Sequence, residues 1–193
     1  AGLVLYGLTI TFASFDWVMS LEPHWFSTIF GVLFMGGQAL SALAFVIAVL
    51  IALARTAPMA AIVTPTHLHD LGKLLLAFVM LWAYFNFSQY LLTFAANLVE
   101  EIPYMLTRTS NGWQYLAVFL VLFHFFVPWF LLLSRNLKRT PYRLVIIACW
   151  ILFVRFADIY MLVSPEFDTS GGNLHLLAGE HASHFFFHWV DIA

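Results

Sequence analysis

Charged side chains are scarce in this sequence. They make up 9% of its 193 residues, whereas hydrophobic residues make up 63% and the mean hydropathy is +0.91. Because soluble globular domains are about 25% charged, this composition excludes a soluble globular domain and indicates a membrane protein. The net charge of −2 also argues against a nucleic-acid partner, since phosphate binding relies on clustered Lys and Arg side chains.

Cysteine is almost absent as well. Cys149, the single cysteine, lies inside an apolar segment. This excludes a disulfide framework, a CxxCH haem attachment motif and a set of thiolates for zinc or iron–sulfur clusters. Because the sequence opens at Ala1 within an apolar run and closes on HFFFHWVDIA, which resembles the start of another span, we expect a fragment that is truncated at both ends.

Long apolar segments are what the sequence contains instead. They lie at residues 2–19, 26–54, 71–97, 114–134 and 143–164, and each is near or above the roughly 20 residues that cross a bilayer as a helix. We therefore predict an all-α fold, a polytopic integral membrane helix bundle with about five transmembrane helices and the start of a sixth. Residues 1–193 are expected to form a single transmembrane domain.

The cations are unevenly distributed between the two expected faces of the membrane. If successive helices alternate in direction, the connections 55–70 and 135–142 lie on one face, which contains Arg55, Lys73, Arg135, Lys138, Arg139 and Arg143. The other face has only Arg108 among several acidic residues. By the positive-inside rule, we expect the first face to be the cytoplasmic side of a bacterial inner membrane and the second to be periplasmic.

Three features of the sequence predict where helices begin, end or bend. Asp70 suits the start of the third helix, and Ser164–Pro165 suits the end of the fifth. Pro128 lies inside the fourth span. Its missing N–H group predicts a kink there and a free carbonyl that neighbouring helices or water must satisfy.

Ionisable residues lie deep inside the fourth and fifth spans, where they are costly and usually face a bundle interior with a partner. Arg155 and Asp158 are three residues apart in the fifth span, so they can form an ion pair. This pair either locks helix packing or belongs to a proton path or a headgroup site. His124 lies near the middle of the fourth span, where a lone histidine is more often a packing residue than a ligand. No second histidine lies at a comparable depth, so b-type haem, which needs paired axial histidines, is not expected.

A stripe of polar residues runs along the third span. Asn86, Gln89, Thr93 and Asn97 recur at helical spacing, so they lie on one face of the helix. These side chains either form interhelical hydrogen bonds or, as we favour, line a hydrated path or a small-molecule cleft.

The connection between the first two spans is unusually polar and aromatic. Its sequence, FDWVMSLEPHWFST, contains Asp16, Glu22 and His24, which we expect at about the level of Glu100 near the periplasmic side. The two tryptophans of this segment fit an interfacial aromatic belt.

A second polar segment, THLHD at 66–70, is expected to be a loop on the cytoplasmic side. It contains His69 and Asp70, and two histidines with one acid are a weak metal pattern. Proton uptake or helix capping is favoured over metal binding.

Four segments of this chain, taken in order, resemble one family of membrane proteins. They are FASFDWVMSLEPHWFSTIFG, LHDLGKLLLAFVMLWAYFNFSQYLLTFAANLVEEIPYML, GWQYLAVFLVLFHFFVPWFLLLSRNLKR and RFADIYMLVSPEF. They are similar to the ActF-type membrane subunits of bacterial alternative complex III, within the NrfD/PsrC-like family. The resemblance extends over essentially the whole chain.

The resemblance implies a multi-helix membrane subunit of a quinol:electron-acceptor (cytochrome c) oxidoreductase complex. Its implied partners are an iron–sulfur protein, a multihaem cytochrome c and a homologous quinol-oxidising membrane subunit, ActC. Haem c and the iron–sulfur clusters would belong to these partner subunits, and this chain would bind no redox centre of its own. Its implied role is structural support with a proton path, and quinol is a potential ligand. The positions that match the family's polar motifs are Asp16, His24, His69, Asp70, Asn86, Gln89, Glu100, His124, Arg155 and Asp158.

No residue is predicted to be catalytic, and no metal site is expected. The candidates for a proton path or a quinol site are Asp16, Glu22, His24, His69, Asp70, Asn86, Gln89, Asn97, Glu100, His124, Arg155 and Asp158. One alternative makes this chain the quinol-binding subunit itself, with His124 or Asp158 accepting a proton and Gln89 donating to a quinone carbonyl. Another is an independent ion or solute transporter, which is less favoured because the spans are mostly uninterrupted.

Overall fold

All the regular elements that the structure describes are helices. The computed structural model describes residues 2–22, 25–96, 98, 101–109 and 112–176, and their side chains as far as residue 165. Within these residues, five stretches are long and apolar enough to cross a membrane: Gly2–Leu21, Phe30–Leu53, Pro65–Ala96, Trp113–Leu133 and Pro141–Pro165. The expected all-α polytopic bundle is therefore confirmed.

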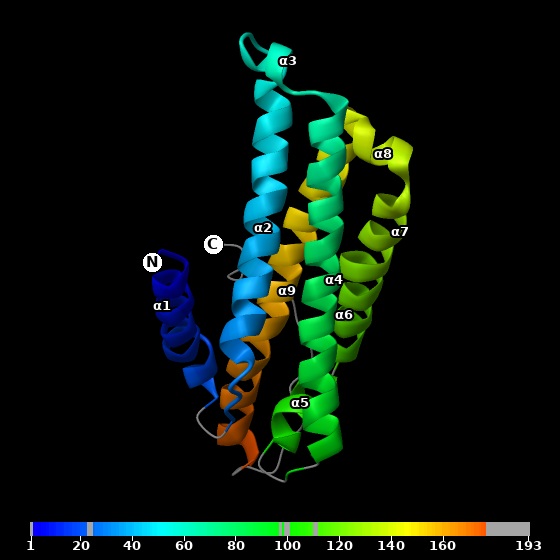
Figure 1. Ribbon diagram of the computed structural model, residues 1–193. Helices are drawn as coiled ribbons and strands as arrows, with labels where there is room; N and C mark the ends of the chain where they lie inside the picture. The colour runs from blue at the N-terminus through cyan, green and yellow to red at the C-terminus, as the bar shows by residue number, and fades with distance from the viewer. Residues whose placement is uncertain (1, 23–24, 97, 99–100, 110–111, 177–193) are drawn as a thin grey trace.

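The chain runs back and forth between two ends of the bundle. Its first half contains α1 (Gly2–Trp17), the 3-10 helix η1 (Met19–Leu21), α2 (Phe30–Leu53), the short α3 (Met59–Ile62) and α4 (Pro65–Ala96). Its second half contains α5 (Ile102–Thr109), α6 (Trp113–Leu120), the π-helical η2 (Val121–Phe126), α7 (Val127–Leu133), α8 (Arg135–Arg139) and α9 (Pro141–Leu176). Helices α3 and α8 lie at one end of the bundle, the α3–α8 end, and α5 lies at the other, the α5 end (Figure 1).

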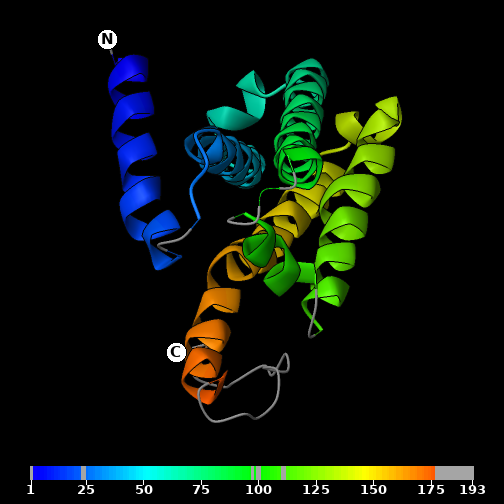
Figure 2. The same cartoon turned by 90° about the horizontal axis from the view of Figure 1, so that it is seen from below.

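Helices α2, α4 and α9 form the centre of the bundle. Helix α2 packs on both α4 and α9, and α4 also packs on α7 and α8. The core that they form with α7 contains Leu40, Ile47, Leu75, Leu132 and Ile151, which are fully buried. Helix α1 packs mainly on α2 and lies at the edge of the bundle (Figure 2).

The third spanning helix begins at Pro65, earlier than the expected start at Asp70. Thr64 caps it: its Oγ1 accepts from the backbone N–H of His67 at 3.4 Å, and its own N–H donates to His67 Nδ1 at 3.5 Å. Proline suits the first helical position because its missing N–H would be unpaired there anyway. The segment 66–70 is consequently helical and not a loop, and Asp70 is an exposed partner of Lys73 at 3.2 Å.

The fifth spanning helix does not end at Ser164–Pro165, as the sequence predicted. Helix α9 continues through Pro165 to Leu176. A proline inside a helix removes one backbone hydrogen bond, and α9 continues past this loss.

The predicted disturbance at Pro128 takes the form of the π-helical segment η2, which lies directly before α7. In π-helical geometry the carbonyl of residue 123 would accept from the N–H of residue 128, and proline has none. The indole of Trp150 on α9 supplies the missing donor, because its Nε1 lies 3.0 Å from the Phe123 carbonyl oxygen. A neighbouring helix thus satisfies a freed backbone group inside the membrane.

Candidate functional site

An ion pair lies inside the bundle, as the sequence predicted. Arg155 Nη1 donates to Asp158 Oδ2 on the next turn of α9, and the two side chains are only 6% and 13% exposed. Trp82 on α4 donates from its indole Nε1 to the same Asp158 oxygen at 3.0 Å. One carboxylate oxygen therefore accepts from two helices, which fixes the position of the acid.

The guanidinium group of Arg155 fits only because α2 has a glycine beside it. It occupies the space over Gly37, where any Cβ atom would collide with its terminal nitrogens. Among the described residues, Arg155 Nε has no hydrogen-bond partner, and Asp158 is the only acid paired with this arginine. The cation is therefore held by one carboxylate and by close packing.

His124 adds a second titratable group to this region. It lies in η2, is fully buried, and packs its ring against Trp82 with 4.0 Å between centroids and 55° between planes. Neither ring nitrogen has a hydrogen-bond partner in the described part of the chain. A neutral imidazole has one acceptor and one donor nitrogen, so both ring nitrogens of His124 are available to a polar ligand. We refer to Trp82, His124, Arg155 and Asp158 as the membrane cluster.

Trp82 and Asp158 of the membrane cluster border a cleft of about 570 Å³. Small-molecule sites typically have a volume of about 300–1,000 Å³, with apolar walls and a few polar groups. The walls come from α2, α4, α5, α6, η2 and α9 and are mostly apolar, and their polar members are Trp82, Asn86, Gln89, Tyr90, Tyr104, Arg108, Thr109 and Asp158. The cleft therefore has the size and composition of a site for an apolar molecule with a polar head.

The polar stripe on α4 bonds to the connection before α2 and also lines the cleft. Asn86 Nδ2 donates to the Trp82 carbonyl at 2.9 Å, and Gln89 Oε1 accepts from Ser27 Oγ, outside α4, at 2.8 Å. Gln89 Nε2 also donates to Thr93 Oγ1 at 3.3 Å. Asn86 and Gln89 line the cleft, so the stripe joins elements and also forms a wall.

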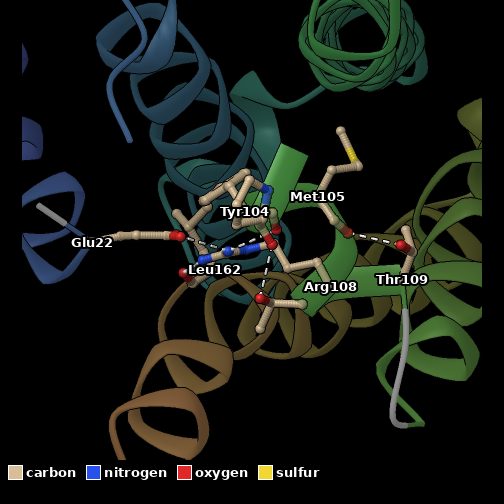
Figure 3. A network of polar contacts seen from close by, with 8 residues as sticks. Glu22, Tyr104, Met105, Arg108, Thr109 and Leu162 are labelled. Atoms are coloured by element: carbon tan, nitrogen blue, oxygen red, sulfur yellow. Dashed lines mark hydrogen bonds and ion pairs between the residues drawn. The ribbon is translucent and has the colours of Figure 1, made fainter. Parts of the chain in front are cut away.

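Arg108 joins three parts of the chain at the α5 end of the cleft (Figure 3). Its Nη1 donates to Glu22 Oε2 at 3.4 Å and to the Tyr104 carbonyl at 3.2 Å, and its Nη2 donates to the Leu162 carbonyl on α9 at 3.2 Å. The guanidinium carbon lies 3.6 Å from the centre of the Tyr104 ring, a cation–π contact. Glu22 is thus an anchor for Arg108, with its side chain 17% exposed.

Trp25 lies in the connection between α1 and α2, close to Glu22 in the sequence, and it packs on Tyr104 as well. Trp25 is 3% exposed and stacks on Tyr104, with 3.7 Å between centroids and 5° between planes. It packs inside the protein, whereas Trp17 on α1 is 71% exposed and fits the expected interfacial position. The sequence interpretation missed Arg108 and Tyr104 as site residues, although Arg108 is the single cation on its expected face.

The remaining candidates lie elsewhere. Asp16 is exposed on α1 and does not line the cleft. His69 and Asp70 lie in the first turns of α4, toward the α3–α8 end. His24, Asn97 and Glu100 lie outside the described residues. Within the described ranges, no group of three or more His, Cys, Asp or Glu residues is placed to hold a metal ion.

No protein-family model matches this chain, and no curated protein matches it.

Proposed function

We propose that this chain is a membrane subunit of a quinol:electron-acceptor (cytochrome c) oxidoreductase of the alternative complex III type, and that its membrane cluster belongs to a proton path. The main support is the buried Arg155–Asp158 pair, which borders a cleft inside a bundle with five apolar spans. Ionisable residues at such depth are costly and commonly mark proton or substrate paths. The sequence resemblance to the NrfD/PsrC-like family supports the assignment to a respiratory complex.

The chemistry of quinol oxidation requires groups that accept protons. Oxidation of a quinol to a quinone releases two electrons and two protons. In the proposed complex, haem c and iron–sulfur clusters of the partner subunits take the electrons. Asp158 reaches the cleft wall, and a carboxylate at this position is a group that can accept a proton.

Polar groups continue from Asp158 along the cleft wall. Asn86 and Gln89 provide amide groups that hydrogen-bond water, and Thr93 is bonded to Gln89 toward the α5 end. His124 packs against the Trp82 indole and offers a ring nitrogen that can accept a hydrogen bond from water. These groups give protons a route between the membrane cluster and the α5 end, which we propose to be periplasmic.

A second candidate function is quinol binding by this chain itself. The cleft of about 570 Å³ favours it, because an apolar tail suits its walls and a ring hydroxyl suits its polar members. In this arrangement Gln89 or Asn86 would hydrogen-bond a ring oxygen, and Asp158 would accept the proton.

Purification of the tagged full-length parent from its native membrane tests the leading proposal, and photolabelling of the same material separates it from the second candidate. We expect haem c spectra, iron–sulfur signals and quinol oxidation in the purified material. A single haem-free species with solute flux in liposomes would instead identify a transporter. Labelling of this chain by an azidoquinone, suppressed by excess quinol, would favour the second candidate, whereas labelling of a sister subunit alone would eliminate it.

A further inference from the structure

A buried lysine lies at the α3–α8 end of the bundle, far from the cleft. Lys138 on α8 is 6% exposed. Its side chain lies on α4, so close that a Cβ atom at Gly72 would be 2.7 Å from Lys138 Cγ. Within the part of the chain that the structure describes, its ammonium group has no hydrogen-bond or ion-pair partner. The buried part of Lys138 is its aliphatic stem, which packs on Gly72, and the ammonium group at the end of the stem is left free for an anion.

The charges around Lys138 are mostly of its own sign. Lys73 follows Gly72 on α4, and Arg135 and Arg139 lie on α8 with Lys138. Burial lowers the pKa of the Lys138 ammonium group, and the charge of Lys73 lowers it further. The nearby acid on α4, Asp70, is paired with Lys73 at 3.2 Å.

His69 belongs to the same region. His69 lies one helical turn before Lys73 on α4. Its Nδ1 atom is buried and has no hydrogen-bond partner among the described residues. A second unsatisfied polar atom thus lies beside the partnerless cation.

The position of α8 in the membrane indicates which anion would pair with these cations. Helix α8 connects a span that ends at Leu133 with a span that begins at Pro141, so it lies where hydrocarbon gives way to headgroups. The anion in that layer is the phosphodiester of a phospholipid, and basic pockets between transmembrane helices are known to bind such headgroups. We propose that His69, Lys73, Arg135, Lys138 and Arg139 form a binding site for the phosphate group of an anionic phospholipid.

This site is independent of the proposed function, and lipid selectivity tests it. The full-length protein is reconstituted into phosphatidylcholine nanodiscs, and the association of spin-labelled phosphatidylglycerol is measured relative to spin-labelled phosphatidylcholine. Each charge near a membrane surface contributes about 1 kcal/mol, so Lys138→Met should lower the relative association constant about fivefold. Arg135→Gln, which replaces an exposed side chain, should lower it similarly.

Arg55→Gln is the matched control, because Arg55 is exposed at the same end of the bundle but lies outside the site. We expect it to leave the preference nearly unchanged. An equal loss in Arg55→Gln would reduce the site to general surface charge and overturn the proposal. Loss of the preference on addition of inorganic phosphate, but not of sodium chloride at equal ionic strength, would identify free phosphate and overturn the lipid assignment.

Thermal unfolding of the same variants gives a second measurement. Without phosphatidylglycerol, Lys138→Met should be about as stable as the wild type, because methionine keeps an unbranched apolar stem against Gly72 and removes a charge with no partner. Phosphatidylglycerol should then stabilise the wild type and Arg55→Gln but not Lys138→Met. Equal stabilisation of all three proteins would contradict the site.

Discussion

Gly37 and Arg155 depend on one another, although they lie on different helices. The glycine has no side chain, and the guanidinium group fills the space that a side chain would need. Arg155 and Asp158 therefore pair in the space that Gly37 leaves open. Without Asp158, the arginine would be a buried charge with no partner.

We predict that Gly37→Ala displaces the guanidinium group from Asp158 and destabilises the protein. Separating a buried pair typically costs about 3–5 kcal/mol, and thermal or denaturant unfolding in detergent measures the loss. Gly7→Ala is the control, because a Cβ atom there meets nothing within 4 Å and alanine is a better helix former than glycine by about 1 kcal/mol. Equal effects of the two substitutions would show that the pair does not depend on Gly37.

Residue-level prediction from the sequence succeeded where the partners are close in the chain. The spacing of Arg155 and Asp158 within one helix was enough to predict their ion pair. The bond from Trp82 to Asp158 spans 76 residues and depends on how α4 packs against α9. No local pattern reports such a contact, and the same holds for Arg108 and Glu22, 86 residues apart.

At the scale of elements, the π-helical segment η2 shows how one helix can supply a hydrogen-bond donor that another helix lacks. Pro128 leaves the Phe123 carbonyl without its helical donor, and Trp150 on α9 provides one at 3.0 Å. An unsatisfied carbonyl in a membrane interior is costly because no bulk water replaces the bond. The indole of Trp150 is therefore expected to stabilise the fourth span as well as its own helix.

Trp150→Phe should destabilise the protein by about 1–3 kcal/mol beyond the loss of packing, because it leaves a carbonyl unpaired inside the membrane, where no bulk water replaces the bond. Pro128→Ala restores a backbone donor, so Trp150→Phe should cost less in that background. The difference between the two backgrounds, measured by unfolding in detergent, isolates the hydrogen bond from the packing. Trp17→Phe on the exposed face of α1 is the control. Identical costs of Trp150→Phe in the wild-type and Pro128→Ala backgrounds would contradict this account of η2.

The sequence predicted the elements better than their ends. Long apolar runs were enough to find the five spans. The sequence also contains the signal for the start of α4, because Thr64 and Pro65 form a helix start. The prediction placed the start at Asp70 instead. The continuation of α9 through Pro165 was not predictable from proline chemistry alone, which favours a helix end there.

At the scale of the whole molecule, polar groups gather in three places along the bundle. The basic site around Lys138 lies at the α3–α8 end, the membrane cluster lies inside, and the Arg108 contacts lie at the α5 end. The uneven distribution of cations was visible in the sequence, and Figure 1 shows that the connections expected to share a face do lie at one end. The polar stripe on α4 indicated only one wall of the cleft, because the other walls come from helices that are distant in the sequence.

This arrangement links the proposed proton path to one measurable quantity of the whole complex. The membrane cluster opens on the cleft through Asp158, and the proposed path continues along Asn86 and Gln89. If protons from quinol oxidation take this path, neutralising Asp158 should change how many protons move for each electron. Electron transfer itself should persist, because this chain is proposed to hold no redox centre.

The measurement is the proton-to-electron ratio of the assembled complex in proteoliposomes, with Asp158→Asn compared to the wild type. Asparagine keeps an oxygen for the Trp82 indole but cannot ionise. The double variant Arg155→Gln with Asp158→Asn removes both charges and so avoids a buried cation with no partner. Asp70→Asn, which changes an exposed carboxylate in the first turns of α4, is the control.

We predict that the ratio falls in both Asp158 variants, with quinol oxidation retained, and stays unchanged in Asp70→Asn. An unchanged ratio in the assembled Asp158 variants would contradict the proton path.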